Sequence, residues 1–105
     1  MFCKIINREI GSSVVFEDDR IIAIKDIKPL APVHILLITK KHVANLEEID
    51  EDDIELLGYI QWRAREIARD LGLGGNYRIM TNCGEKAGQM VFHLHYHLLG
   101  GKEMD

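Results

Sequence analysis

Apolar residues alternate with polar ones, or run together, in five short segments of the chain, and a period of two is typical of β-strands. Asp18-Asp19 separates the first two segments by a tight turn, which predicts a hairpin. Pro29 and Pro32 punctuate the connection before the third segment. The strands predicted in this way cover residues 13–17, 21–25, 33–39, 77–82 and 92–99.

A longer segment, Asp50 to Leu71, has the helical period instead, because its apolar residues recur every three or four positions. Acidic residues crowd its first turn, arginines favour its later turns and Gly72 follows its end, as the helix dipole and C-cap preferences require. The apolar positions of this predicted helix are Ile54, Leu57, Ile60, Ala64, Ile67, Ala68 and Leu71. A short helix or turn is predicted at residues 2–7.

These elements predict an α+β fold, in which a five-stranded antiparallel sheet carries one long and one short helix on one side. A chain of 105 residues is long enough for one hydrophobic core and too short for two, so residues 1–105 are expected to form a single domain. A sheet of this size leaves strand edges, which is compatible with a homodimer.

Two polar residues stand on otherwise apolar strand faces. Asp26 shares a face with Ile24 by parity, and it either belongs to a binding site or caps the turn that follows. His34 shares a face with Leu36, in a strand that is apolar on both faces and is therefore expected to be covered on both sides. This histidine is either a core residue bonded to a backbone carbonyl or a member of a site shared with other histidines.

The composition indicates which kinds of partner and which cellular compartment to expect for this protein. Thirteen basic residues against seventeen acidic ones give a net charge of −4, which argues against nucleic acid as a partner. The apolar runs are too short to span a membrane, so no membrane partner is expected. Cys3 and Cys83 are too few for a disulfide framework, and no charged-then-apolar leader follows Met1, so a cytoplasmic, reduced protein is predicted. Seven carboxylates between Glu47 and Glu55 are interpreted as a solvated loop and helix start.

The strongest indication of chemistry is a run of three histidines, His93, His95 and His97, at alternate positions of the last predicted strand. Alternation places the three imidazoles on one face, with neighbours roughly 6.5 to 7 Å apart along the strand. A structural strand would carry Val, Ile or Thr there, because a buried imidazole needs hydrogen-bond partners. We therefore expect all three rings to act on a single small substrate group, with partly solvated strand histidines as the alternative.

A neutral imidazole is a nucleophile that can carry a phosphoryl or nucleotidyl group covalently and then release it. Mutual repulsion among adjacent histidines discourages full protonation and keeps at least one of them neutral near pH 7. The preceding loop suits such chemistry, since Gly84 and Gly88 allow close approach of the backbone and the amides of residues 89–91 could point at an anion. Asn82 offers further amide donors. By itself, however, this loop is typical of an ordinary glycine-containing hairpin.

The segment from Gly88 to Leu99 resembles the signature of the histidine triad (HIT) family, in which histidines alternate with apolar residues after a Gly-Gln loop. The likeness covers nearly the whole chain and is closest to the Hint-like branch of nucleoside phosphoramidate hydrolases. It extends to Lys4-Ile5-Ile6, Phe16 to Arg20, Asp26-Ile27, Ala31 to His34, Lys40 to His42 and Asp70 to Leu73. The resemblance implies a purine nucleoside phosphoramidase that binds an AMP-like nucleotide and acts through a covalent nucleotidyl-histidine. It also implies a homodimer with a continuous sheet, no cofactor and no catalytic metal.

The resemblance further implies roles for individual residues. His95 would be the nucleophile, His97 would contact the phosphate and His93 would support and orient the nucleophile. His34 would complete the proton network, and Asp26 would hold the ribose hydroxyls. The phosphate would be surrounded by Asn82, Gln89 and the amides of Met90 and Val91. The purine would be walled by Phe2, Ile5, Ile10, Ile24, Ile27 and Leu36.

The chain departs from the family pattern in three places. Met90 occupies a position where Hint-like members often carry a Ser or Thr hydroxyl facing the phosphate, and a thioether donates no hydrogen bond. The chain stops at Asp105 without the longer tail of some relatives, which leaves the preferred leaving group open. Many bacterial-type relatives begin with a Cys-x-x-Cys zinc pair, of which this chain keeps only Cys3. Together with His42 and His93 it supplies three ligands where structural zinc takes four.

Two other interpretations stay open. The histidines, with His34, could instead hold zinc or another divalent ion for a metal-dependent hydrolysis, although the triad segment contains no carboxylate to support such an ion. Alternatively, the chain is a nucleotide-binding or protein-interaction module with weak or vestigial catalysis, which Met90 and the short C-terminus would favour.

Overall fold

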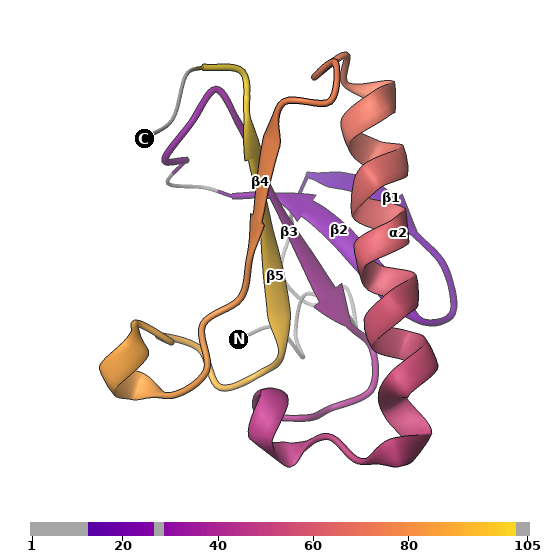
Figure 1. Cartoon of the computed structure of the whole chain (residues 1–105), viewed down its shortest axis with the longest axis vertical. Helices are drawn as coiled ribbons and strands as arrows, with labels where there is room; N and C mark the ends of the chain where they lie inside the picture. Colours follow the sequence, from indigo (N-terminus) through magenta and orange to yellow (C-terminus); the bar gives the residue numbers. More distant parts are fainter. Residues whose placement is uncertain (1–12, 27–28, 103–105) are drawn as a thin grey trace.

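The structure is a computed structural model and describes residues 13–26 and 29–102. Within them, five strands form one antiparallel sheet in the order β1-β2-β3-β5-β4 (Figure 1). The strands are β1 (Val14–Glu17), β2 (Ile21–Lys25), β3 (Val33–Thr39), β4 (Tyr77–Met80) and β5 (His95–Gly100). The helices are α2 (Ile54–Asp70) and the short 3-10 helices η1 (Leu46–Glu48), η2 (Glu51–Asp53) and η3 (Glu85–Ala87). The predicted five-stranded α+β fold is confirmed, and the short helix predicted at residues 2–7 lies outside the described residues.

Three predicted boundaries differ from the observed ones by more than one residue, each for a local reason. The long helix becomes α-helical only at Ile54, because a capping box at Asp50 first winds η2. β5 begins at His95 rather than at residue 92, because Leu94 already donates its amide to the Val43 carbonyl, beyond the end of β3, at 2.7 Å. β4 ends at Met80, and residues 81 and 82, predicted as strand, already belong to the connection that leads to η3.

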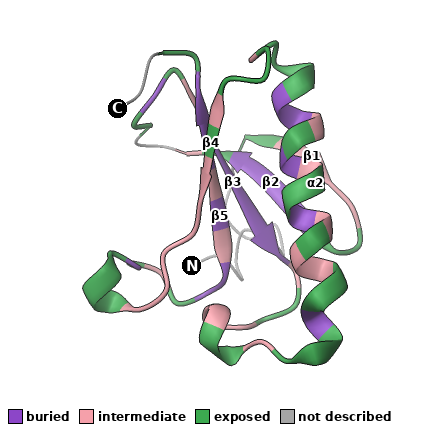
Figure 2. Ribbon diagram, in the orientation of Figure 1, coloured by how far each residue is buried: buried purple, intermediate pink, exposed green. Residues whose placement is uncertain are grey.

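The alternation of side chains along the strands separates two apolar clusters. The larger cluster fills the space between the sheet and α2, and its completely buried strand residues are Ile21, Ala23, Leu37 and Leu98. The smaller cluster lies on the opposite face and consists of Ile22, Ile24, Leu36 and Ile38, with Val91 packed against it. Figure 2 shows the resulting stripe of buried residues along the central strands. The strand β3 is therefore apolar toward both sides, as its sequence predicts.

The acidic segment at the start of α2 is only partly the solvated surface that its composition predicts. Asp53 is buried, and its carboxylate accepts a hydrogen bond of 2.6 Å from the ammonium group of Lys41. This bond holds the pKa of Asp53 below its usual value and raises the pKa of Lys41. The pair therefore fastens the segment after β3 to the beginning of the helix.

The two ends of α2 also differ from the predicted apolar stripe. Ile60, Ala64, Ile67 and Ala68 are buried against the sheet, whereas Ile54 and Leu71 are exposed. Gly72 follows the helix with a φ of 73°, the left-handed conformation that favours glycine at this position.

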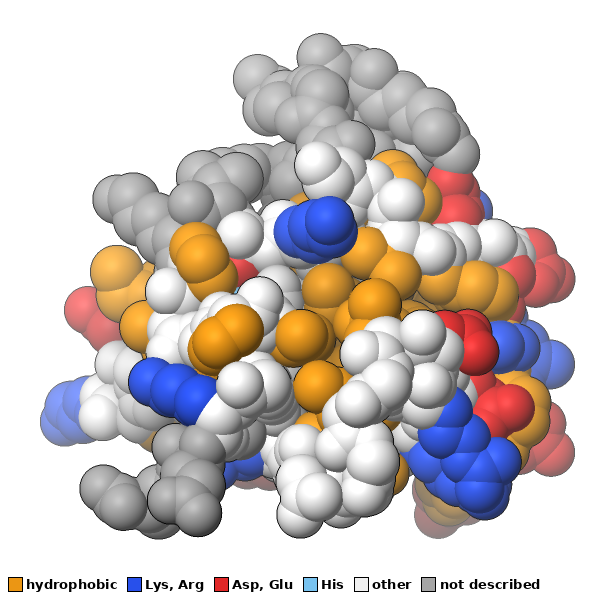
Figure 3. Space-filling view, turned by 90° about the horizontal axis from the view of Figure 1, so that it is seen from above, with side chains coloured by type: hydrophobic (Ala, Val, Ile, Leu, Met, Phe, Trp, Pro, Cys, Tyr) orange, Lys and Arg blue, Asp and Glu red, His pale blue; other side chains and the backbone are white. Residues whose placement is uncertain are grey.

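Figure 3 views the molecule from above, the end at which α2 finishes, and no histidine side chain is visible there. Among the described residues, no helix is long and apolar enough to cross a membrane.

Candidate active site

His95 opens β5, and a backbone carbonyl fixes the orientation of its ring. The Nδ1 atom of His95 lies 2.7 Å from the carbonyl oxygen of His93. A carbonyl only accepts, so Nδ1 must carry the hydrogen and the lone pair of the neutral ring is on Nε2. The ring is half-buried, and the Thr81 hydroxyl donates to the carbonyl of the same residue at 2.7 Å. His95 is thus held in the tautomer that a nucleophile attacking through Nε2 requires.

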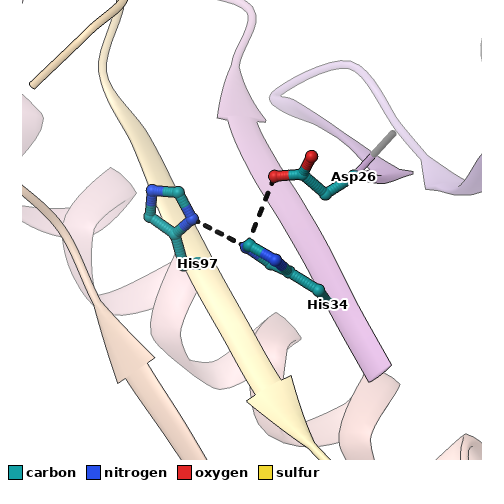
Figure 4. A group of neighbouring side chains, drawn as sticks. All are labelled: Asp26, His34 and His97. Carbon is teal, nitrogen blue, oxygen red and sulfur yellow. Dashed lines mark hydrogen bonds and ion pairs between the residues drawn. The ribbon is translucent and has the colours of Figure 1, made fainter. Parts of the chain in front are cut away.

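His97 stands two residues further along the same face, and its ring centroid lies 5.1 Å from that of His95. Its Nδ1 atom is 2.9 Å from Nε2 of His34, which comes from β3 (Figure 4). The same His34 nitrogen lies 3.5 Å from a carboxylate oxygen of Asp26, just after β2. The three side chains therefore meet, although Asp26 follows β2, His34 lies near the start of β3 and His97 lies within β5.

Burial determines the charge of His97. Loss of hydration lowers the pKa of His97 to about 4, and the nearby His95 and His34 add to this shift while Asp26 opposes it. The mutual repulsion that the sequence predicts is therefore present, but it is secondary to burial. At neutral pH the His97 ring is uncharged and has one N–H to donate.

His93 differs from its two neighbours, and here the expectation of three rings around one substrate group is wrong. His93 lies before the start of β5, and its side chain is 3% exposed. The Nε2 atom of this side chain donates to the Thr39 carbonyl at 2.6 Å. Burial lowers the pKa of His93 as well. Its contribution to the site comes from its backbone carbonyl, which orients His95.

The other ring nitrogen of His93, Nδ1, lies 3.1 Å from Nδ1 of His42. These two histidines are members of the three-ligand zinc set suggested by the sequence, and the structure brings them together. The third member, Cys3, lies outside the described residues. Two imidazoles and one thiolate are suitable zinc ligands, but they leave one of the four positions of a structural site to be filled.

The loop between β4 and β5 turns on two glycines, as its sequence predicts. Gly84 and Gly88 have φ values of 95° and 97°. The side chain of Gln89 is 2% exposed and closes this loop from inside. Its amide nitrogen donates to the carbonyls of Ala44, at 2.6 Å, and Val91, at 3.1 Å, while its oxygen accepts from the Gly84 amide at 2.8 Å. The Gln89 side chain therefore holds the loop together through these three hydrogen bonds. The resemblance implies a different role for it, a contact with the phosphate.

The remaining predicted residues lie partly inside and partly outside the described part of the chain. Asn82 is half-buried and lies near Gly88, where an added Cβ would meet the Asn82 side-chain amide at 3.5 Å. Met90 is 88% exposed. Ile24 and Leu36 pair across β2 and β3 on the histidine face, in agreement with the parity of the sequence. The other four residues of the predicted purine wall, Phe2, Ile5, Ile10 and Ile27, lie outside the described residues.

Sequence reasoning missed the two threonines that hold the histidine segment. Thr39 is completely buried and accepts from His93, while Thr81 secures the carbonyl of His95. A threonine at a strand end is common, so only the pairing of these segments in space could have pointed to them.

The sheet thus presents the His95 imidazole in a defined tautomer, the neutral His97 imidazole beside it and a carboxylate, which is an arrangement suited to nucleophilic group transfer. Comparison with known proteins agrees. A family model described as "Scavenger mRNA decapping enzyme C-term binding" matches residues 1–104. The chain is 56% identical to a structure described as a HIT family hydrolase from Clostridium thermocellum, with a TM-score of 0.95 over 99% of this chain and 91% of that one.

Two curated relatives extend the comparison. An uncharacterised HIT-like protein from Synechocystis is 49% identical over 97% of this chain and 90% of its own length. A protein named adenylylsulfatase HINT1 from Arabidopsis thaliana is 44% identical over 100% of this chain and 73% of its own length. The chain therefore belongs to the histidine triad (HIT) family.

Proposed function

We propose that this protein is a nucleotide hydrolase that cleaves purine nucleoside phosphoramidates through a covalent nucleotidyl-histidine on His95. The observation that supports it most directly is the hydrogen bond of 2.7 Å from His95 Nδ1 to the His93 carbonyl, which leaves the lone pair on Nε2. Membership of the HIT family and the likeness to a structure named as a hydrolase support the same class of reaction.

In the first step the Nε2 lone pair of His95 attacks phosphorus, a P–Nε2 bond forms and the bond to the departing amine breaks. The amine nitrogen takes up one proton from solvent as it leaves. In the second step water attacks phosphorus, the P–Nε2 bond breaks, and one proton returns to solvent with release of the nucleoside monophosphate. His97 and the amides of Met90 and Val91 would stabilise the phosphoryl oxygens, with Asn82 beside them.

The nucleoside would be held by the face of the sheet opposite α2. Asp26 would accept hydrogen bonds from the ribose hydroxyls, and Ile24 and Leu36 would form part of the purine wall, together with Phe2, Ile5, Ile10 and Ile27. His34 would complete the network behind His97, and Gln89 would act by bracing the loop. The Arabidopsis relative is named an adenylylsulfatase, so a sulfate-bearing adenylyl group is the second leaving-group chemistry to test.

The test is rapid quenching of the enzyme with adenosine phosphoramidate, followed by mass spectrometry of the peptide that contains His95. We expect an adenylyl adduct in the wild type and none in His95→Ala, which should still bind AMP but hydrolyse a fluorogenic phosphoramidate at least 10²-fold more slowly. Equal, slow turnover by the two proteins would contradict the enzyme and favour a nucleotide-binding module. Parallel assays with adenylyl sulfate would identify the preferred leaving group.

A further inference from the structure

The connection between β2 and β3 reaches into the histidine cluster through one backbone amide. Leu30 donates its N–H to Nδ1 of His34, with a separation of 3.1 Å between the two nitrogens. The side chain of Leu30 points elsewhere and is 64% exposed. The contribution of this residue to the cluster is therefore its main-chain hydrogen atom rather than its hydrocarbon.

A backbone amide is always a donor, so the nitrogen that faces it must be an acceptor. Nδ1 of His34 consequently carries no hydrogen, and the single N–H of the neutral ring is on Nε2. The surroundings of Nε2 agree with this assignment, because a carboxylate oxygen of Asp26, which also accepts, lies 3.5 Å away. A doubly protonated His34 would place two hydrogens against each other at Leu30.

The same reasoning applies to the ring of His97. Nε2–H of His34 lies 2.9 Å from Nδ1 of His97, so Nδ1 of His97 must accept and its own hydrogen must be on Nε2. The His97 ring is neutral at pH 7, so this hydrogen is the one it has to offer. Figure 4 shows that Nδ1 of His97 is the nitrogen turned toward His34. Nε2 is on the other side of the ring.

We propose that the backbone amide of Leu30 is a positioning group that fixes the tautomers of His34 and His97, so that His97 presents Nε2–H as a permanent hydrogen-bond donor. Its catalytic consequence rests on the proposed function: the donor would face a phosphoryl oxygen of the nucleotide. A neutral His97 can share this hydrogen but not surrender it, because the product would be an imidazolate anion. His97 thus stabilises charge and is not the source of the proton that the departing amine takes up.

The same amide acts against metal binding by this cluster. Asp26, His34 and His97 place three possible ligand atoms within 4.8 Å of one another. A divalent ion would need the lone pairs of His34 Nε2 and His97 Nδ1 together. The first of these is occupied by hydrogen as long as Leu30 donates to the other side of the ring, so the cluster is built to share a hydrogen rather than a cation.

The experiment is ¹⁵N NMR of the imidazole nitrogens in the ligand-free full-length protein at pH 7. We expect protonated, pyrrole-type nitrogens at Nε2 of His34 and His97, and unprotonated nitrogens at their Nδ1 atoms. The critical variant carries the α-hydroxy analogue of leucine at position 30, which replaces the amide by an ester and removes only the N–H. In that variant the two rings should exchange between tautomers, and kcat/KM should fall about tenfold, the equivalent of one neutral hydrogen bond.

Two controls separate this role from a structural one. The same analogue at Leu73 removes a backbone hydrogen bond of equal length, 3.1 Å to Ala68, at the end of α2, and should leave both tautomers unchanged. Leu30→Ala keeps the amide and should resemble the wild type. A hydrogen on Nδ1 of His97 in the wild type, or unaltered tautomers in the position 30 ester, would overturn the proposal. Because the tautomers are measured without substrate, an inactive wild type would count against the proposed function alone.

Discussion

At the scale of single residues, hydrogen bonds to the main chain decide what each histidine can do. The His93 carbonyl, the Thr39 carbonyl and the Leu30 amide each face one ring nitrogen and thereby assign its hydrogen. The rings of the triad are chemically identical in the sequence, yet they differ in burial and in hydrogen-bond partner in the fold. We therefore expect the three neighbouring histidines to have different roles.

The depressed pKa of His97 predicts that stability falls as the solution becomes acidic. A histidine in the unfolded chain titrates near 6.5, whereas His97 in the fold titrates at about 4. Between these two values only the unfolded chain takes up the proton, so the fold loses stability as pH falls through this window. Urea unfolding at pH 7 and pH 5 should show a lower free energy of unfolding at pH 5. In His97→Asn the loss should be smaller, and an equal loss in both proteins would contradict this assignment.

Met90 offers a gain of activity rather than a loss. Its side chain is almost fully exposed, so a substitution costs little packing. In Met90→Ser a hydroxyl placed beside the proposed phosphate position could donate one hydrogen bond, and we expect kcat/KM on a nucleoside phosphoramidate to rise by roughly fivefold, the equivalent of about 1 kcal/mol. Met90→Ala serves as the control, because it removes the thioether without adding a donor. No increase in the serine variant would show that position 90 does not contribute to the chemistry.

At the scale of elements, the loop between β4 and β5 depends on one buried amide side chain. In Gln89→Ala the Ala44 and Val91 carbonyls and the Gly84 amide all lose their partner. We expect the free energy of unfolding to fall by about 2 to 3 kcal/mol, since each of the three partly buried backbone groups that loses this partner costs on the order of 1 kcal/mol. Denaturant unfolding measures this loss. The exposed Lys86→Ala in η3 is the control, and a similar small effect of both changes would contradict the bracing role.

α2 contains a glycine that its packing does not require. Nothing lies within 4 Å of the position that a Cβ on Gly58 would occupy. Alanine has the higher helix propensity, so Gly58→Ala should raise the free energy of unfolding by about 1 kcal/mol. Thermal unfolding provides the measurement. Gly88→Ala is the contrasting control and should be destabilising, because Gly88 has a φ of 97°.

Periodicity predicted the elements well and their ends less well. β2 and β3 have the predicted bounds, because their apolar runs are bordered by Asp18-Asp19 and by the Pro29 to Pro32 connection. β5 starts later than predicted, since the alternation continues through His93 although β3 has no residue left to pair with it. A period of two describes where side chains point, and it does not say where a neighbouring strand stops.

The sequence predicts which polar residues share the histidine face, but it does not predict which contacts each of them makes. The parity of Asp26 with Ile24, and of His34 with Leu36, correctly placed both polar residues on the histidine face. The burial of His93 and the inward turn of Gln89 depend on contacts between segments more than forty residues apart, such as Gln89 with Ala44. The Thr81 anchor depends on the contact of the segment after β4 with the start of β5. No local pattern carries that information.

At the scale of the whole molecule, the sheet formed by the described residues ends in an edge strand at each side, β1 and β4. An unprotected edge can pair with a second copy, and we predict a homodimer in which the sheet continues across the interface. Light scattering coupled to size-exclusion chromatography of the full chain should give about twice the monomer mass of 12.0 kDa. A mass equal to that of one chain at micromolar concentration would contradict the dimer.

The separation of the two sheet faces has a practical consequence for engineering. The two apolar clusters share no residue, so we expect that substitutions in the larger cluster, between the sheet and α2, can raise heat resistance with little effect on the histidine face. Conversely, substitutions on the histidine face can be used to vary the substrate range while the layer between the sheet and α2 is kept unchanged. Directed evolution of this chain can therefore use two independent libraries, one selected for thermal stability and one for substrate selectivity. The best variants of the two libraries can then be combined.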